Sequence, residues 1–407
     1  MTGDTHNFGR RVEIVGDRVR KPRTIRWERL LLDRASPLRA CLREVGRASA
    51  LGEAAFEFLP SLAFEPHADG PGGDVERIDL APLGAIDAVE RRELASIAGR
   101  AIALFSWLGL ADLHWENLAL GRNGAGRIVF GPLDVELVLD DLARPTETKL
   151  LPDADPEYAA LCRHAAGVRR LLPWLGKPVD PGDLAWIVAG YDRALTLLDA
   201  SSAAIAAAIA SVPGVREAPI RVLLRATGEY APNRLRDAWP PLLEAEREQL
   251  ARGDVPYFFR TLGRDGLFHY ADASLRTAHR LPSEGDVPEL APLLSLERGL
   301  RSKRRARLHD EGVFTIVGAF DDRRFEGTFE ADGAAITFAR RAVVVRRDGG
   351  DELETARNLG AFVGSVYLPC VCGEVEGAIA ANPSRCENRD QSRLFSRLQR
   401  RPPRRGR

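Results

Sequence analysis

The sequence predicts an α+β protein in which a small strand-rich region is followed by a larger helical region and a small β appendage. Three observations carry this prediction. Residues 12–25 alternate apolar and polar side chains as strands do, and residues 88–109 repeat apolar side chains at helical spacing. Residues 312–347 contain three alternating runs separated by Asp/Gly turns, which is typical of an antiparallel sheet.

Length and composition describe an ordinary globular protein. The chain has 407 residues, 45% of them hydrophobic, with 58 basic and 58 acidic side chains. This balance favours neither a nucleic-acid partner nor an anionic membrane. No stretch approaches the roughly 18 apolar residues of a membrane span, and the N-terminus lacks an apolar signal core. Five cysteines form no even framework, so we expect cytoplasmic thiols.

Lysine is rare in this chain, which makes each lysine a candidate for a specific role. Only four of the 58 basic residues are lysines, and arginine is not a free substitute because it presents a planar fork rather than a compact charge. The four are Lys21, Lys149, Lys177 and Lys303.

The N-terminal region, 1–87, is expected to be a strand-rich lobe. Val12, Ile14 and Val19 lie on two alternating runs joined by a Gly16–Asp17 turn, which predicts a β-hairpin. Apolar residues at threes and fours predict a helix over 27–48, and a further strand and turn are expected over 74–84.

Residues 88–300 are expected to form a helical lobe. A helix over 88–109 precedes a loop and a strand pair over 118–138. Residues 156–252 are mostly helical in pattern, including a buried Ala-rich helix near 200–214, and 252–270 returns to strands. The β appendage occupies 301–350, and 351–407 is interpreted as a residual helix followed by a disordered Arg/Pro-rich tail. This order of parts is compatible with a bilobed, kinase-like fold.

The segments "DLHWEN" (112–117) and "PLDVE" (132–136) carry the residue types of phosphoryl transfer. Asp112 and Asn117 are five positions apart, as a kinase catalytic loop spaces its acid and its metal-binding amide. Asp134 follows a predicted strand, and Glu136 lies two residues on, so both carboxylates face the same side and suit Mg²⁺.

Lys21, which ends the predicted hairpin, is the candidate for binding ATP phosphates. Each of these short patterns alone is more often a solvated loop or strand end. Their combination, in the expected order and on the expected local structures, favours the phosphoryl-transfer site.

Five segments together resemble the dehydratase domain of class II lanthipeptide synthetases (the LanM type). They are "GDTHNFGRRVEIVGDRVRKPR", "DLHWENLAL", "PLDVE", "RVLLRATGEY" and "RGDVPYFFR", and the resemblance covers roughly residues 3–300. It implies a lipid-kinase-type fold. It also implies an enzyme that phosphorylates Ser and Thr of a precursor peptide with ATP and Mg²⁺, and then eliminates the phosphate to leave dehydroamino acids.

The resemblance also implies roles for individual residues. Lys21 would bind ATP phosphates, Asp112 would be the acid/base of phosphorylation with His114 shaping its loop, and the metal would be held by Asn117, Asp134 and Glu136. Elimination would use Asp4, His6, Arg221 and Thr227. An arginine fork suits a departing phosphate. The structural alternatives are a frayed terminus for Asp4 and His6, an ordinary ion pair for Arg221, and a hydroxyl bonded to its own backbone for Thr227.

The chain departs from this family at both ends. The family has a segment before the "GDTHN" motif and a C-terminal cyclase domain with a zinc site, and the chain is too short for that domain. We expect Cys370, Cys372 and Cys386 to be free thiols rather than zinc ligands, because no histidine follows them.

Three functions therefore stay open. The chain is a stand-alone dehydratase that partners a precursor peptide and a separate cyclase, a kinase without elimination, or an inactive fragment that binds the precursor or a partner. The retained chemistry-bearing residues favour the first.

Overall fold

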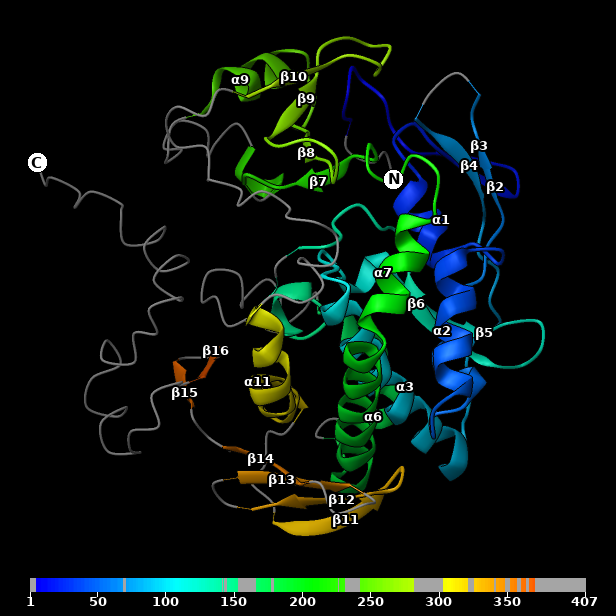
Figure 1. Ribbon diagram of the computed structural model, residues 1–407, viewed down its shortest axis with the longest axis vertical. Helices are drawn as coiled ribbons and strands as arrows, with labels where there is room; N and C mark the ends of the chain where they lie inside the picture. Colours follow the sequence, from blue (N-terminus) through cyan, green and yellow to red (C-terminus); the bar gives the residue numbers. More distant parts are fainter. Residues whose placement is uncertain are drawn as a thin grey trace, which may run out of the picture.

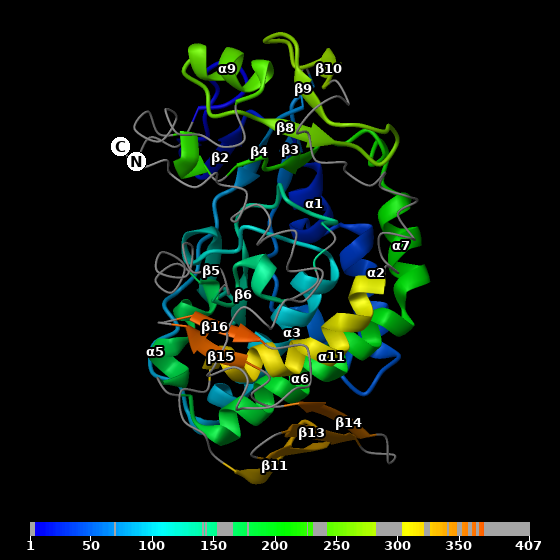
Figure 2. The same ribbon diagram turned by 90° about the vertical axis from the view of Figure 1, so that its left-hand side faces the viewer.

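The computed structural model is a mixed helix-and-sheet protein, as the α+β prediction requires (Figure 1). The chain is described over residues 5–68, 71–140, 142, 145–152, 166–176, 179–225, 227–230, 242–281, 303–320, 326–339, 342–347, 352–356, 360–363 and 366–369. Long helices occupy the middle of the molecule, with one sheet at each end of its long axis (Figure 2).

The N-terminal sheet is antiparallel and has the strand order β1-β2-β4-β3. Its strands are β1 (Glu13–Val15), β2 (Arg18–Lys21), β3 (Phe64–Pro66) and β4 (Gly73–Glu76). The predicted hairpin is confirmed, with Ile14 paired to Val19 across the Gly16–Asp17 turn. The strand expected within 74–84 is also confirmed, as β4.

The single helix expected over 27–48 is wrong, because the chain forms two helices there. They are α1 (Arg26–Leu32) and α2 (Pro37–Arg47). Ser36 caps α2 by accepting a hydrogen bond from the Leu38 amide, and Pro37 occupies the first turn, where its missing N–H costs nothing. The apolar spacing runs through the break, so periodicity alone did not reveal it.

A packed pair of long helices forms the central core. They are α3 (Ala88–Trp107) and α6 (Pro181–Ala200). Asp87 and Glu90 form a capping box at the start of α3, as the predicted helix boundary requires. Gly99 allows close approach of the two helices, since a Cβ there would overlap the backbone of α6 at Ile187. The shorter helices here are α5 (Leu172–Leu175) and α7 (Ser202–Ala210).

Two further strand groups extend from this core. The predicted strand pair is confirmed as a hairpin of β5 (Leu118–Arg122) and β6 (Ile128–Pro132). A sheet of order β10-β9-β8-β7 lies at one end of the molecule beside α9 (Glu244–Ala251). Its strands are β7 (Ile220–Val222), β8 (Phe258–Arg260), β9 (Phe268–Tyr270) and β10 (Ala278–Arg280). The strand β7 therefore interrupts the region expected to be mostly helical.

The C-terminal part corrects two predictions. The first alternating run of 312–347 is the second half of a helix, α11 (Lys303–Phe320), which docks on α6 where Tyr191 Oη donates to the Leu308 carbonyl over 2.8 Å. Residues 351–368, expected to be helical, contribute strands instead, because β14 pairs with β13 along a continuous register. The strands are β11 (Gly327–Ala331), β12 (Ala334–Phe338), β13 (Ala342–Arg347), β14 (Glu352–Ala356), β15 (Gly360–Val363) and β16 (Val366–Pro369).

Short 3₁₀ helices complete the fold: η1 (Glu53–Phe56), η2 (Trp115–Asn117), η3 (Pro145–Thr148), η4 (Gly167–Arg170) and η5 (Thr227–Tyr230). Within the described ranges, no single helix has the length and apolar character needed to cross a membrane; α6 and α7 meet that test only together, across a 67° bend. The predicted disordered tail and the three C-terminal cysteines lie outside the described residues.

Candidate active site

Lys21 forms a buried ion pair that the sequence analysis did not anticipate. It is the last residue of β2 and only 5% exposed. Its Nζ lies 2.8 Å from Glu28 Oε1 on α1 and donates to the Leu133 carbonyl over 3.0 Å. An ammonium has three donors, so Lys21 retains one N–H for a further acceptor such as a phosphate oxygen.

Arg23 lies at the centre of a cluster of three carboxylates. Its guanidinium is 3.0 Å from Glu28 Oε1, 2.5 Å from Asp134 Oδ1 and 2.5 Å from Glu136 Oε1. Burial works to raise the pKa of Asp134, but the charges of Arg23 and Lys21 outweigh burial and hold that pKa well below its ordinary value. Asp134 is therefore an anion at neutral pH.

The predicted catalytic loop places Asp112 beside a second rare lysine. Asp112 adopts a left-handed conformation (φ 63°), and its Oδ1 lies 2.7 Å from Lys149 Nζ. The Asn117 amide donates to the Asp112 carbonyl over 2.9 Å, which leaves its side-chain oxygen as the group that could bind a cation. A non-glycine residue held at positive φ is a feature that often accompanies functional loops.

Leu133 connects the loop, the acidic segment and Lys21 through its backbone. Its N–H donates to the Asn117 carbonyl over 2.8 Å, and its carbonyl accepts from Lys21. Asp134 follows directly. The structure thus brings Lys21, Asn117 and Asp134 to one place, although they are far apart in the sequence.

Glu136 joins this cluster to Arg221. The two side chains are 3.2 Å apart at Glu136 Oε2, and the Arg221 amide donates to the Glu136 carbonyl over 3.1 Å. The guanidinium also lies 5.4 Å from the ring centre of Tyr257. Its Nε is buried and makes no hydrogen bond within the described part of the chain. Arg221 therefore forms the ordinary ion pair that was the structural alternative for it, with Glu136 as its partner. Its Nε is a donor that an incoming anion could use.

His6 belongs to a segment that we call the strap, residues 5–10, and is held in place by Val255. The His6 Nδ1 lies 2.8 Å from the Val255 carbonyl, and its ring lies edge-on to Tyr257 at 6.1 Å. A carbonyl only accepts, so Nδ1 carries the proton and Nε2 is the basic nitrogen of the neutral ring. His6 and Arg221 thus both lie against one tyrosine, Tyr257.

Asp254 anchors the strap to the rest of the molecule. Its buried carboxylate accepts hydrogen bonds of 2.8 Å from the amides of Phe8 and Gly9. Arg252 stacks over the Phe8 ring at 4.2 Å. Through these contacts the segment "RGDV" (252–255) binds the segment "THNFGR" (5–10). The strap is therefore not a frayed terminus over residues 5–10.

The remaining predicted residues are placed as follows. Asp4 lies outside the described residues. Thr227 begins η5 and is exposed, and no hydrogen bond within the described residues joins it to Arg221. His114 is partly buried, immediately before η2, with its Nδ1 3.9 Å from Glu116 Oε2. Its backbone bridges to Ala166, which is compatible with a loop-shaping role.

The predicted metal ligands fit Mg²⁺ only in part. Asp134 and Asn117 supply hard oxygen atoms, and the Asp134 side chain is 31% exposed. Glu136 has one oxygen paired with Arg23 and the other with Arg221, so it would have to release an arginine to bind a cation. Among the described residues no three His, Cys, Asp or Glu side chains group as metal ligands. A magnesium ion here would rely on Asp134, Asn117, water and phosphate oxygens.

Four residues of this site were given no role at the sequence level: Arg23, Glu28, Lys149 and Asp254. Lys149 had a usable signal, because it is one of only four lysines. Arg23 and Asp254 stand in two of the segments that carry the resemblance, and Glu28 is one of many acids.

Comparison with protein-family models, curated proteins and solved structures found no match to this chain.

Proposed function

We propose that the chain is a dehydratase that phosphorylates Ser and Thr of a ribosomally made precursor peptide with ATP and Mg²⁺, and then eliminates the phosphate, in lanthipeptide biosynthesis. The proposal includes the kinase-like, bilobed arrangement and the resemblance to the class II lanthipeptide dehydratase domain. The observation that carries it is the continuous chain of ion pairs from Lys21 through Glu28, Arg23 and Glu136 to Arg221, with His6 and Arg221 both beside the Tyr257 ring.

The first half of this reaction is supported by the Lys21–Glu28 pair and the Asp112 loop. A buried lysine–glutamate pair is the device by which kinases present a lysine to nucleotide phosphates. Asp112 would accept the proton of the Ser or Thr hydroxyl as its oxygen attacks the γ-phosphorus of ATP and ADP departs. Lys149 holds the Asp112 carboxylate in its orientation. A magnesium ion, when bound, supplies charge neutralisation for the transferring phosphoryl group.

The second half is supported by His6 and Arg221. Elimination removes the Cα proton of the phosphorylated residue, forms the Cα–Cβ double bond and breaks the Cβ–O bond, so inorganic phosphate departs. His6 Nε2 is the candidate base, and Arg221, with its unbonded Nε, is the candidate partner of the departing phosphate. Glu136 contacts both arginines of the site, so it can couple the two halves.

Mass spectrometry tests the proposal and separates its alternatives. The chain is incubated with ATP, Mg²⁺ and a Ser/Thr-containing precursor peptide encoded beside it. A net loss of water supports the dehydratase, whereas a stable gain of phosphate supports the kinase without elimination. No change under any condition supports the inactive fragment that binds the precursor or a partner.

Four variants refine the test. Arg221→Ala should accumulate phosphopeptide, because only the second step loses its phosphate partner. Asp112→Ala should leave the peptide unmodified. Normal dehydration by Arg221→Ala would refute the elimination assignment. Thr227→Ala and His114→Ala test the two roles that rest on the resemblance alone.

A further inference from the structure

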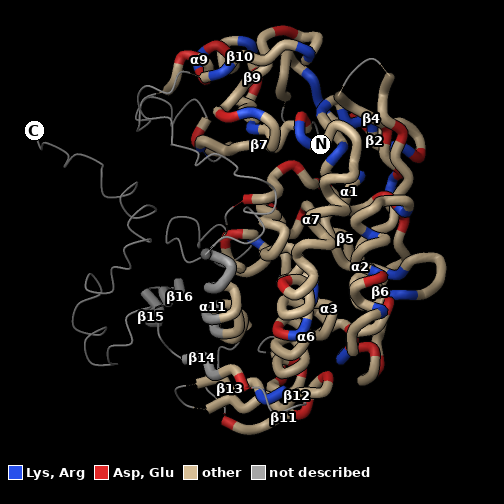
Figure 3. The backbone as a smooth tube through the Cα atoms, viewed as in Figure 1, with Lys and Arg blue, Asp and Glu red and all other residues tan. Residues whose placement is uncertain are grey.

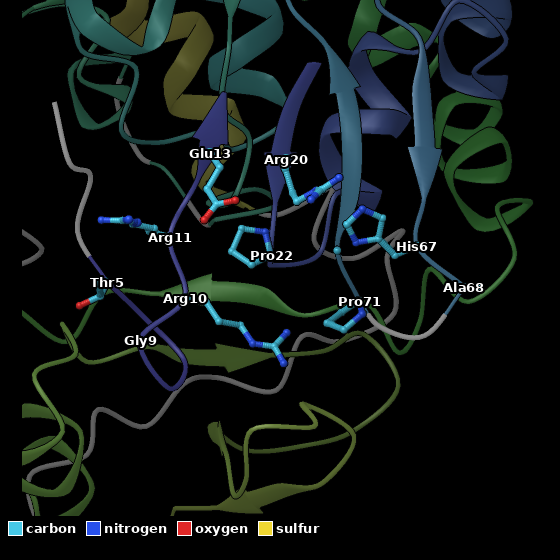
Figure 4. Close-up of a pocket in the computed structure, with 11 residues that line it drawn as sticks. Thr5, Gly9, Arg10, Arg11, Glu13, Arg20, Pro22, His67, Ala68 and Pro71 are labelled. Carbon is cyan, nitrogen blue, oxygen red and sulfur yellow. The ribbon is translucent and has the colours of Figure 1, made fainter. Parts of the chain in front are cut away.

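A large open cavity lies beside the candidate site and has no part in the chemistry proposed above. It has a volume of about 860 Å³ and lies between the strap, the β1–β2 hairpin and the loop that precedes β4 (Figure 4). Its chemistry-bearing lining residues are Arg10, Arg11, Glu13, Arg20 and His67, and Pro22 lies between Lys21 and Arg23 at its inner side. A residue that lines the cavity, Pro22, thus directly follows Lys21, the candidate phosphate-binding lysine.

Cationic side chains dominate this lining. Arg20 and His67 share a single carboxylate, Asp74, at 3.1 and 3.3 Å. The Arg10 guanidinium donates to the Ala273 carbonyl. Arg11 is exposed and has no hydrogen-bond or ion-pair partner among the described residues. The lining therefore contains three arginines and one carboxylate, Glu13, with Asp74 behind Arg20 and His67. An anionic group is the complementary ligand.

The same cavity opens onto an unprotected sheet edge. The strand β1 is the terminal strand of its sheet, and in the described part of the chain no strand pairs with its outer side. Val12, Ile14 and Val15 are 41%, 68% and 47% exposed, and they are three of the five large apolar side chains that are exposed among the described residues. Proteins ordinarily cover such edges or place charges on them, because free N–H and C=O groups recruit another strand.

The charge of the whole molecule does not account for this arrangement. Basic and acidic residues are interspersed along the backbone, with neither sign dominating the described part (Figure 3). The juxtaposition of an arginine-lined cavity with an apolar strand edge is therefore a local feature.

We propose that β1 and this cavity form a docking site for an extended peptide segment that carries aliphatic and acidic side chains. The segment adds to the sheet as a strand beside β1. Its aliphatic side chains cover Ile14 on one face of the sheet, and an acidic side chain on the other face enters the cavity beside Arg11. Backbone hydrogen bonds supply affinity and the side-chain positions supply selectivity, as in other cases of strand addition.

This inference rests on the proposed function, because it assigns the segment to the peptide substrate, outside the residue that reacts. Its position is suited to that task. The next strand, β2, ends at Lys21, and the strap that borders the cavity carries His6. A segment held on β1 would keep the remainder of the peptide near both halves of the site, which raises its effective concentration there.

Fluorescence anisotropy with the full chain and no ATP tests the docking site. The probe is a fluorescein-labelled synthetic peptide of alternating Val and Glu, and the comparison probe replaces each Glu with Lys. We expect the Glu peptide to bind and the Lys peptide to bind at least about tenfold more weakly. Arg11→Glu and Ile14→Lys should each weaken binding of the Glu peptide by about tenfold.

Matched controls make the result specific. Arg127→Glu reverses an exposed arginine on the β5–β6 hairpin, and Val89→Lys changes an exposed valine at the start of α3. Both should bind the Glu peptide as the unmodified chain does. Circular dichroism melting of all four variants establishes that each is folded.

Several results would overturn the inference. One is equal binding of both probes, and another is an undiminished affinity in folded Arg11→Glu and Ile14→Lys. Analytical ultracentrifugation provides a third: a dimer that Ile14→Lys dissociates, without peptide binding, would show that a second copy covers β1. The assay contains no ATP, so a failure of docking with normal dehydration refutes only the docking site. Docking without any mass change of the precursor refutes only the proposed function.

Discussion

Replacement of Asp254 by asparagine is expected to separate the two proposed chemical steps. The Asp254 carboxylate accepts from the amides of Phe8 and Gly9 at 2.8 Å each, and both residues hold positive φ values of 70° and 75°. An asparagine side chain offers one acceptor and one donor group, so one of the two amides would face an NH₂ group instead of an oxygen. The strap, and His6 with it, should then detach.

The size of the effect follows from the two buried contacts. A hydrogen bond to a charged group contributes about 1.5–3 kcal/mol, and a buried amide left without an acceptor costs about 1–3 kcal/mol. Because asparagine can still accept one of the two bonds, we expect a loss of about 3 kcal/mol in the free energy that holds the strap closed. That corresponds to roughly a 100-fold rise in the open population.

Hydrogen–deuterium exchange and product mass check this expectation together. Amides of residues 5–10 should exchange roughly 100-fold faster in Asp254→Asn, and the precursor should accumulate as phosphopeptide because His6 is displaced while Asp112 and Lys21 are not. Asp272→Asn is the matched control, since Asp272 accepts a hydrogen bond from the Ser274 amide in the exposed turn between β9 and β10. Unchanged exchange in Asp254→Asn, or unchanged dehydration with fast exchange, would refute the reasoning.

Three further changes have defined outcomes. Lys149→Met should slow phosphorylation by about 10- to 100-fold without weakening ATP binding, because the proposed role of the lysine is to orient Asp112. Lys149→Arg should recover part of the rate. Weakened ATP binding in Lys149→Met would contradict this role. Gly99→Ala should lower stability in urea by about 2–3 kcal/mol through overlap with α6, whereas Gly124→Ala, in open space, should not. Burial raises the pKa of Asp134 less than Arg23 and Lys21 lower it, so its contribution to stability is complete above about pH 4 and is lost as pH falls. Urea midpoints of the unmodified chain and Asp134→Asn should therefore differ most at pH 7, and the difference should shrink progressively, without vanishing, as the pH falls below about 4.

Local patterns predicted the elements whose boundaries are marked by local chemistry. The helix α3 was found from the helical spacing of its apolar residues, and the capping box at Asp87 agrees with the predicted start; β5–β6 was found as a strand pair around a turn. The helix α11 was missed because its apolar side chains at 313, 316, 317 and 320 were interpreted without the preceding turns, which continue the same helical spacing from Leu308. The strand β14 was missed because its pairing with β13 overrides a composition that favours a helix.

The sequence by itself supplied the hypothesis of phosphoryl transfer. Asp112, Asn117, Asp134 and Lys21 were selected as candidates from residue type, order and spacing, since phosphoryl transfer needs few groups. Only the tertiary structure decided which groups share a site. Glu28 pairs with Lys21, and Lys149 pairs with Asp112. Glu136 bridges Arg23 and Arg221 instead of presenting both oxygens to a metal.

These contacts join positions that are up to about 250 residues apart, as the Asp254 anchor of the strap shows. The physical reason is that an ion pair or hydrogen bond depends on distance and burial in space. Those quantities are set by packing of the whole chain, and a sequence window contains neither of them.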